Sequence, residues 1–112
     1  MPTFTLVAWS NPTEGKEDEY GKWYDETHLQ DMLGVPGIKT AQRFKLLRLG
    51  RSKMFDQRYL CLYEFEAEDE ESAKKIINTI NAQNLVLSDS LNISSVNLGV
   101  YQATGPVQVK KK

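Results

Sequence analysis

The sequence predicts an α+β protein in which two helices cover one face of a four-stranded antiparallel sheet. Runs rich in β-branched and aromatic residues, bounded by turn formers, predict strands at 4–9, 38–47, 59–65 and 96–103. Two segments, 16–33 and 69–81, carry their apolar residues at helical spacing. The order along the chain is therefore βαββαβ, which is the ferredoxin-like topology.

The first strand, 4–9, ends at the turn-forming residues 10–12. From Lys16 onward the spacing places an aromatic side opposite a charged side, as expected of an amphipathic helix. The aromatic side comprises Tyr20, Trp23, Tyr24 and Thr27. Because the apolar stripe changes direction near 28–30, we expect the helix to break or tighten there before Gly34 ends it.

The second half of the chain is predicted as a hairpin, a helix and a last strand. Residues 38–47 alternate between two faces, and a polar loop at 50–57 connects them to the β-prone run 59–65. The helix at 69–81 has apolar residues at i, i+3, i+4 and i+7, namely Ala73, Ile76, Ile77 and Ile80. Residues 85–95 follow no clear pattern.

Length and composition indicate one globular unit. We expect a single domain at 1–106 and a flexible tail at 107–112, within a chain of 112 residues that is 40% hydrophobic and 26% charged. The single cysteine, Cys61, can form no internal disulfide, which is typical of a reducing compartment. No apolar stretch approaches the ~18 residues of a membrane span. We therefore expect a cytoplasmic protein that has no membrane partner.

The charges are unevenly distributed around a net charge of −1. Between 39 and 58 there are seven lysines or arginines and one acid, whereas acids gather at 14–26 and 64–71. Such a dipolar surface differs from the basic face of nucleic-acid-binding proteins. We therefore expect no nucleic-acid partner.

The strands predict a partner of another kind, because they are apolar on both sides. In the third strand, Leu60 and Leu62 alternate with Tyr59, Cys61 and Tyr63. Two helices can cover only one face of the sheet, and an exposed face this apolar requires a cover. A second copy of the chain is the simplest cover, so we expect a homodimer.

The region from Tyr20 to Phe44 resembles the EthD-like branch of the dimeric α/β-barrel superfamily. The resemblance lies in Trp23-Tyr24-Asp25 followed by His28, Asp31, Leu33 and Val35-Pro36-Gly37. It implies two ferredoxin-like protomers whose sheets face each other to form a barrel. Gln30 departs from the pattern, since related sequences often carry a proline there. The superfamily includes cofactor-free monooxygenases, cyclases, isomerases and dehydratases, so the resemblance implies no single reaction.

His28, the only histidine, is the first candidate catalytic residue. On a regular helix Tyr24 and Asp25 lie within its reach. Asp25 would then orient the imidazole and raise its basicity, while Tyr24 would hold a substrate oxygen. The alternative is a structural histidine that caps carbonyls at a helix bend.

Four further residues are candidates for substrate binding, each with a structural alternative. Trp23 and Tyr20 could line a pocket for a planar apolar ligand or could be plain core. Asp31 could contact substrate or could cap the short helical segment after it. Arg43 could neutralise a carboxylate or enolate in the barrel, or could pair with an acid of the partner chain.

No metal or other cofactor is expected, because one histidine and one cysteine make no zinc or iron–sulfur site and no glycine-rich phosphate loop follows a strand. Two functions stay open. The first is a cofactor-independent enzyme of lyase, isomerase, cyclase or monooxygenase type that acts on a small apolar or aromatic oxygenated metabolite. The second is a non-catalytic dimeric module that binds a hydrophobic metabolite or partner. A cavity between the long helix and the sheet that His28 reaches would favour the enzyme.

Overall fold

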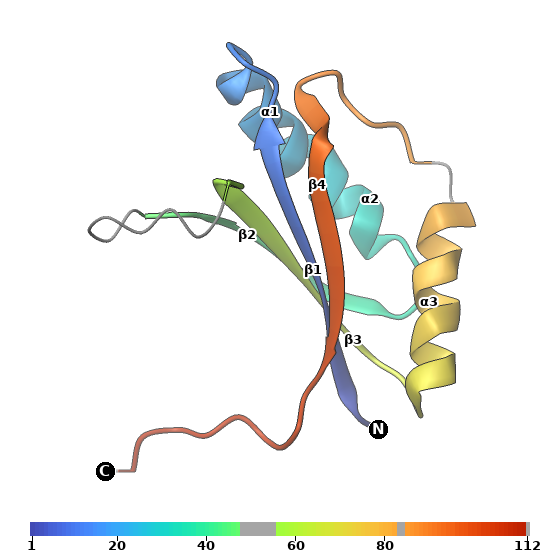
Figure 1. Cartoon of the computed structure of the whole chain (residues 1–112). Helices are drawn as coiled ribbons and strands as arrows, with labels where there is room; N and C mark the ends of the chain where they lie inside the picture. The colour runs from blue at the N-terminus through green and yellow to red at the C-terminus, as the bar shows by residue number, and fades with distance from the viewer. Residues whose placement is uncertain (48–55, 83–84, 112) are drawn as a thin grey trace.

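The computed structural model describes residues 1–47, 56–82 and 85–111 of the chain (Figure 1). Its strands are β1 (Thr3–Pro12), β2 (Ile38–Lys45), β3 (Tyr59–Glu66) and β4 (Leu91–Gln102). The helical segments are α1 (Glu17–Trp23), the π-helical turn η1 (Tyr24–His28), α2 (Leu29–Leu33) and α3 (Glu70–Ala82). The first three helical segments follow one another without interruption, so the order of the elements is the predicted βαββαβ.

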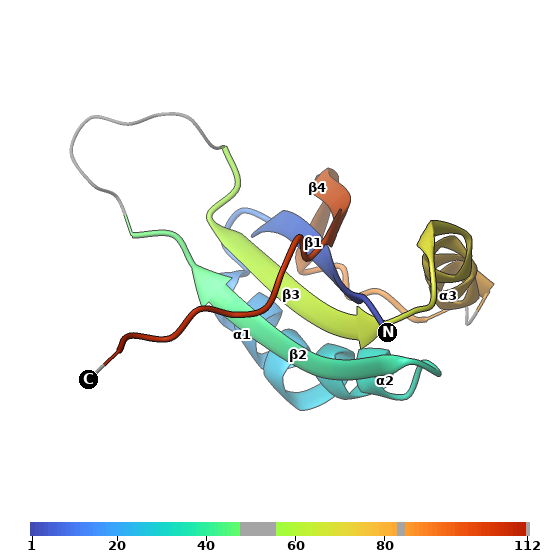
Figure 2. The same ribbon diagram turned by 90° about the horizontal axis from the view of Figure 1, so that it is seen from below.

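The four strands form one sheet in the order β2-β3-β1-β4, and every neighbouring pair is antiparallel. Met32 of α2 and Ile80 of α3 line one cavity together with Leu6 and Ala8 of β1. Both helices therefore lie on the same face of the sheet. Figure 2 shows α1 and α2 along that side of the sheet. The predicted α+β, ferredoxin-like fold class is confirmed.

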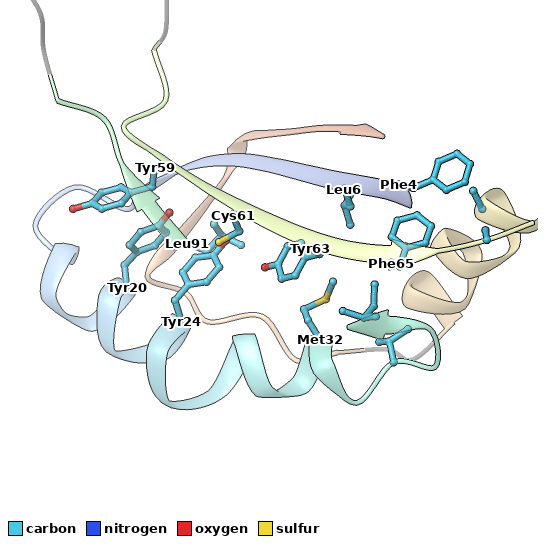
Figure 3. Close-up of a cluster of buried hydrophobic side chains, with 14 residues drawn as sticks. Phe4, Leu6, Tyr20, Tyr24, Met32, Tyr59, Cys61, Tyr63, Phe65 and Leu91 are labelled. Atoms are coloured by element: carbon cyan, nitrogen blue, oxygen red, sulfur yellow. The ribbon is translucent and has the colours of Figure 1, made fainter. Parts of the chain in front are cut away.

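Strand alternation places the hydrophobic core on the helix face. Tyr59, Cys61, Tyr63 and Phe65 of β3 are buried there, whereas Leu60 and Leu62 point to the opposite face and are only partly buried. The rings of Phe4 and Phe65 stack with centroids 5.6 Å apart (Figure 3). The buried Ala73 of α3 and Met32 of α2 complete the contact between helices and sheet.

The long helix differs from the sequence prediction at its centre. A tightened segment was expected near 28–30, but the structure has a wider π-helical turn at 24–28. In a regular α-helix residues five apart point about 140° away from each other. Across η1, by contrast, Trp23 and His28 stack with ring centroids 4.5 Å apart. The extra residue in this turn therefore brings two side chains together that an α-helix would separate.

The connection into β2 requires a glycine. Gly37 has φ +98°, and a Cβ added there would lie 3.0 Å from Cδ1 of Ile76 in α3. The positive φ and the close approach of α3 thus both favour glycine at position 37.

Three strand boundaries differ by two residues or more from those predicted. β1 continues to Pro12, because Pro12 pairs with Leu91, and the same pairing starts β4 well before the predicted residue 96. β2 ends at Lys45 rather than at Leu47. Most of the loop predicted at 50–57 lies outside the described residues. The described part of the predicted tail, 107–111, is exposed.

Replacing Phe65 by alanine is expected to destabilise the fold strongly. Phe65 is 0% exposed, and a phenylalanine-to-alanine change in a packed core costs about 3–5 kcal/mol. Val86 is 81% exposed, so Val86→Ala should change stability by less than about 0.5 kcal/mol. Urea unfolding of both variants measures the difference. Equal stability of the two would contradict the assignment of the core to this face.

Candidate functional site

A cavity of about 390 Å³ lies between the helices and the helix face of the sheet and is partly open to solvent. Side chains from β1, β3, β4, η1, α2, the end of α3 and the segment after it form its wall. They are Leu6, Ala8, Tyr24, His28, Met32, Tyr63, Ile80, Asn81, Leu85, Leu87, Leu91, Val96 and Leu98. Among the described residues that line it, none carries a full charge at neutral pH. The wall is apolar with a few polar groups, as small-molecule sites usually are.

His28 reaches this cavity from the last residue of η1. Its ring stacks on Trp23 and meets the ring of Tyr24 edge-on, with centroids 5.2 Å apart. Its Nδ1 atom is buried and has no hydrogen-bond partner among the described residues. Burial lowers the pKa of His28 below its usual 6.5, and the charge of Asp31 opposes this effect only in part. The imidazole is therefore neutral at pH 7.

Tyr63 brings a second unpaired polar atom to the same cavity. Its hydroxyl is buried beside the Cys61 thiol and has no nitrogen or oxygen partner among the described residues. Figure 3 shows this hydroxyl pointing to the side on which Tyr24 and Cys61 lie. Burial, and then the neighbouring thiol of Cys61, raise the pKa of Tyr63 far above its usual value of 10. The group is thus a phenol that keeps its proton and can donate it in a hydrogen bond.

Tyr20 and Tyr24 share a hydrogen-bonding partner in β1. The Ser10 hydroxyl lies 2.6 Å from the Tyr20 hydroxyl and 3.4 Å from that of Tyr24, and Ser10 is buried. Burial raises the pKa of Tyr20 to about 12, although the hydrogen bond with Ser10 acts in the opposite direction. Tyr20 does not line the cavity. Its hydroxyl is satisfied within the core, so it fits the structural alternative.

Asp25 does not orient His28 as expected. Its carboxylate accepts hydrogen bonds from Arg43, with Nε to Oδ1 at 3.3 Å and Nη2 to Oδ2 at 3.4 Å. The widened turn explains the difference, because the reach from His28 to Asp25 was derived for a regular helix. The guanidinium of Arg43 also lies 5.2 to 5.9 Å from the ring centres of Tyr59, Tyr20 and Tyr24. The pair therefore fastens β2 to η1 and stays outside the cavity wall.

The two remaining candidates also lie outside the wall. Asp31 is exposed, and α2 has no hydrogen bond from a capping side chain, so the expected cap is absent from the described structure. The charge of Asp31 nevertheless raises the pKa of His28. Trp23 is half-buried against the core, and its ring stacks on the imidazole of His28.

Of the predicted site residues, His28 and Tyr24 thus line this cavity together, and the structure adds Tyr63 to them. Asp25 and Arg43 line a separate, more open pocket of about 490 Å³. The alternation of β3 does place Tyr63 on the same face as Cys61, but nothing in the pattern sets it apart from the other buried tyrosines. Tyr63 lines the cavity together with the long helix because that helix packs across β3 in the folded sheet.

No group of three or more histidine, cysteine, aspartate or glutamate side chains that could hold a metal ion occurs in the described ranges. Within the same part of the chain, no helix is both long and apolar enough to cross a membrane.

Comparisons with known proteins agree on the fold. No protein-family model and no curated protein matches the chain. Among solved structures, an ethyl tert-butyl ether D (EthD) family protein from Bacillus halodurans C-125 is 12% identical, with a TM-score of 0.58 over 89% of this chain and 96% of that one. A DABB family protein with a ferredoxin-like fold from Mesorhizobium loti is 7% identical, with a TM-score of 0.59 over 96% and 100%.

A dimeric ferredoxin-like protein from an uncultured marine organism is 13% identical, with a TM-score of 0.57 over 97% of this chain and 93% of that one. This chain has the ferredoxin-like fold. The resemblance inferred from Tyr20 to Phe44 is therefore confirmed at the level of the fold. Identities this low show a common architecture and carry no activity from one protein to another.

The pKa of His28 is expected to depend on Asp31 and not on Asp25. Asp31→Asn removes a charge that favours the imidazolium, so the pKa should fall further below 6.5. Asp25→Asn, the matched control, should leave it unchanged, because that carboxylate is held by Arg43. NMR titration measures this without ambiguity, since the chain has a single histidine. A shift with Asp25→Asn alone would contradict the geometry.

Proposed function

We propose that the protein is a cofactor-independent enzyme that acts on a small apolar or aromatic oxygenated molecule bound in this cavity. One observation carries the proposal: His28 and Tyr63 line the same apolar cavity, and His28 Nδ1 and the Tyr63 hydroxyl are buried without a nitrogen or oxygen partner among the described residues. A buried polar group without a partner costs about 1–3 kcal/mol. A ligand with a suitably placed oxygen would satisfy both groups.

The two groups have complementary roles in proton transfer. Neutral His28 can take a proton from a carbon or oxygen of the ligand, acting as general base through Nδ1. Tyr63, which keeps its proton, can donate a hydrogen bond to the oxygen on which negative charge develops. Apolar walls strengthen both interactions, because little water competes for them. Tyr24 packs against the imidazole and limits its rotation.

This arrangement suits lyase, isomerase or cyclase chemistry through an enolate-like intermediate. In the alternative, a non-catalytic module would use the same cavity to hold a hydrophobic metabolite. The position of His28 favours the enzyme, because its ring lines a cavity between the long helix and the sheet that is partly open to solvent.

We propose further that the protein acts as a homodimer in which two sheets face each other. On the face opposite the helices, Trp9, Phe44, Leu46 and Leu60 contribute to a groove of about 360 Å³, whose lining also includes Lys45, Gln57 and Arg58. Tyr101 is 56% exposed beside Gly99 on this face. Figures 1 and 2 show no helix over it. The dimeric protein of the same fold from a marine organism supports this assembly.

The variant His28→Asn should keep the fold and lose turnover. Asparagine retains a polar atom near the position of Nδ1 but cannot accept a proton at neutral pH, and loss of a general base lowers kcat about 10²–10⁴-fold. In the wild type, kcat/KM should fall as the pH drops through the lowered pKa of His28, with the acid limb below ~6.5. Steady-state kinetics on substrates found in a panel of cyclic ketones and phenols measure both.

Asp31→Asn serves as the control, since it leaves the imidazole in place and should move the acid limb to lower pH. Full turnover by a folded His28→Asn variant would end the enzymatic proposal and leave the binding module.

The variant Tyr101→Glu should convert the dimer into a monomer. A carboxylate in the centre of an apolar interface would be buried without a partner charge. Val86→Glu places the same charge on an exposed apolar residue of the helix side and should leave the dimer intact. Light scattering at micromolar concentration gives the mass of each. A wild-type monomer, or a dimer that survives Tyr101→Glu, would contradict a face-to-face assembly.

A further inference from the structure

The polar groups of the cavity restrict the chemistry of its ligand. Of the polar side chains in the wall, Tyr24 already lies near Ser10, and Asn81 is exposed at the end of α3. His28 Nδ1 and the Tyr63 hydroxyl are left as the buried polar atoms of lining residues that have no nitrogen or oxygen partner in the described part of the chain. No lysine or arginine lines it among the described residues. A carboxylate or phosphate would therefore be buried without an opposite charge, so the ligand that fits is neutral.

The size of the cavity restricts the ligand further. A volume of about 390 Å³ is near the lower end of the range for small-molecule sites. Apart from the two unpaired atoms, the walls consist of aliphatic and aromatic surface such as Leu6, Met32 and Leu98. A molecule of one or two rings with a single polar group matches this space.

The two atoms also differ in what they can offer. Tyr63 keeps its proton and donates a hydrogen bond, so the ligand oxygen must accept one. Neutral His28 acts as a base only if Nδ1 carries no proton, in which case Nδ1 is an acceptor and the ligand must donate to it. A carbonyl oxygen or an ether oxygen can accept but cannot donate. A hydroxyl group does both with one oxygen.

We infer that the cavity recognises a neutral ring compound through one phenolic or enolic hydroxyl, which donates to His28 Nδ1 and accepts from the Tyr63 hydroxyl. This inference rests on the proposed function for the protonation state of Nδ1. It specifies the substrate class of that site and the atom at which a proton leaves.

Four probes of similar shape test it by isothermal titration calorimetry at pH 7, with the His28 ring signals as a second readout. They are 1-naphthol, its methyl ether 1-methoxynaphthalene, the ketone 1-tetralone and the anion 1-naphthoate. We expect 1-naphthol to bind at least tenfold more tightly than the ether and the ketone, and 1-naphthoate not to bind. Binding of the naphthol should move the His28 ring signals.

Two variants assign the preference to the two atoms. His28→Phe keeps a ring on Trp23 but removes the acceptor, so the tenfold preference of 1-naphthol over its ether should disappear. Tyr63→Phe removes the donor and should weaken both ligands by a similar factor, because each of them accepts. Tyr59→Phe, a buried tyrosine of the same strand outside the cavity, should change neither affinity. Circular dichroism confirms that each variant is folded.

Equal affinity for the naphthol and its ether would overturn the inference, as would absence of binding by all four probes. Tighter binding of 1-tetralone would assign two donors to the cavity, and tighter binding of 1-naphthoate would mean that the ligand is an anion. The outcome is separable from that of the proposed function. A hydroxyl preference without turnover would leave the inference standing and end the enzymatic proposal, whereas turnover of a ketone without the preference would do the reverse.

Discussion

The π-helical turn at 24–28 is the feature on which the site depends. Tyr24 continues the spacing of α1 and faces the sheet, where its hydroxyl meets Ser10. The extra residue in the turn after it lets His28 stack on Trp23 and reach the cavity. The same turn directs Asp25 outward to Arg43 of β2, and that ion pair fixes the turn to the sheet edge. Wider turns of this kind are less favourable than regular helix and occur frequently at functional sites. Its retention here is consistent with a role in placing His28.

Burial acts in opposite directions on the two polar groups of the cavity and leaves both neutral. It lowers the pKa of His28, because the imidazolium is the charged form, and it raises the pKa of Tyr63, because the phenolate is the charged form. One apolar cavity therefore holds both a base without a proton and an acid that keeps its own. No further charged residue of the described wall is needed to obtain this pairing.

The two faces of the sheet serve different purposes because strand alternation separates them. In β1, Leu6 and Ser10 belong to the helix face, whereas Val7 and Trp9 belong to the other. The helix face provides the core and the cavity, and the open face provides the apolar surface for a second sheet. A change on one face is thus largely independent of the other, which makes assembly and ligand binding separable in experiment.

The sequence by itself determined the order βαββαβ, a helix at 69–81, observed at 70–82, and the burial of β3, because these follow from local apolar periods of 3.6 and 2 residues. It also selected His28 and Tyr24. Only the tertiary structure decided the partner of Asp25, the start of β4 and the presence of Tyr63 and His28 at one cavity. Each of these depends on contacts between distant segments: the register of β1 with β4, or the packing of the long helix across β3. An inserted residue in a helical turn also changes the direction of the side chains after it, by about 100° in α-helical geometry, and a regular helical period does not predict where such an insertion occurs.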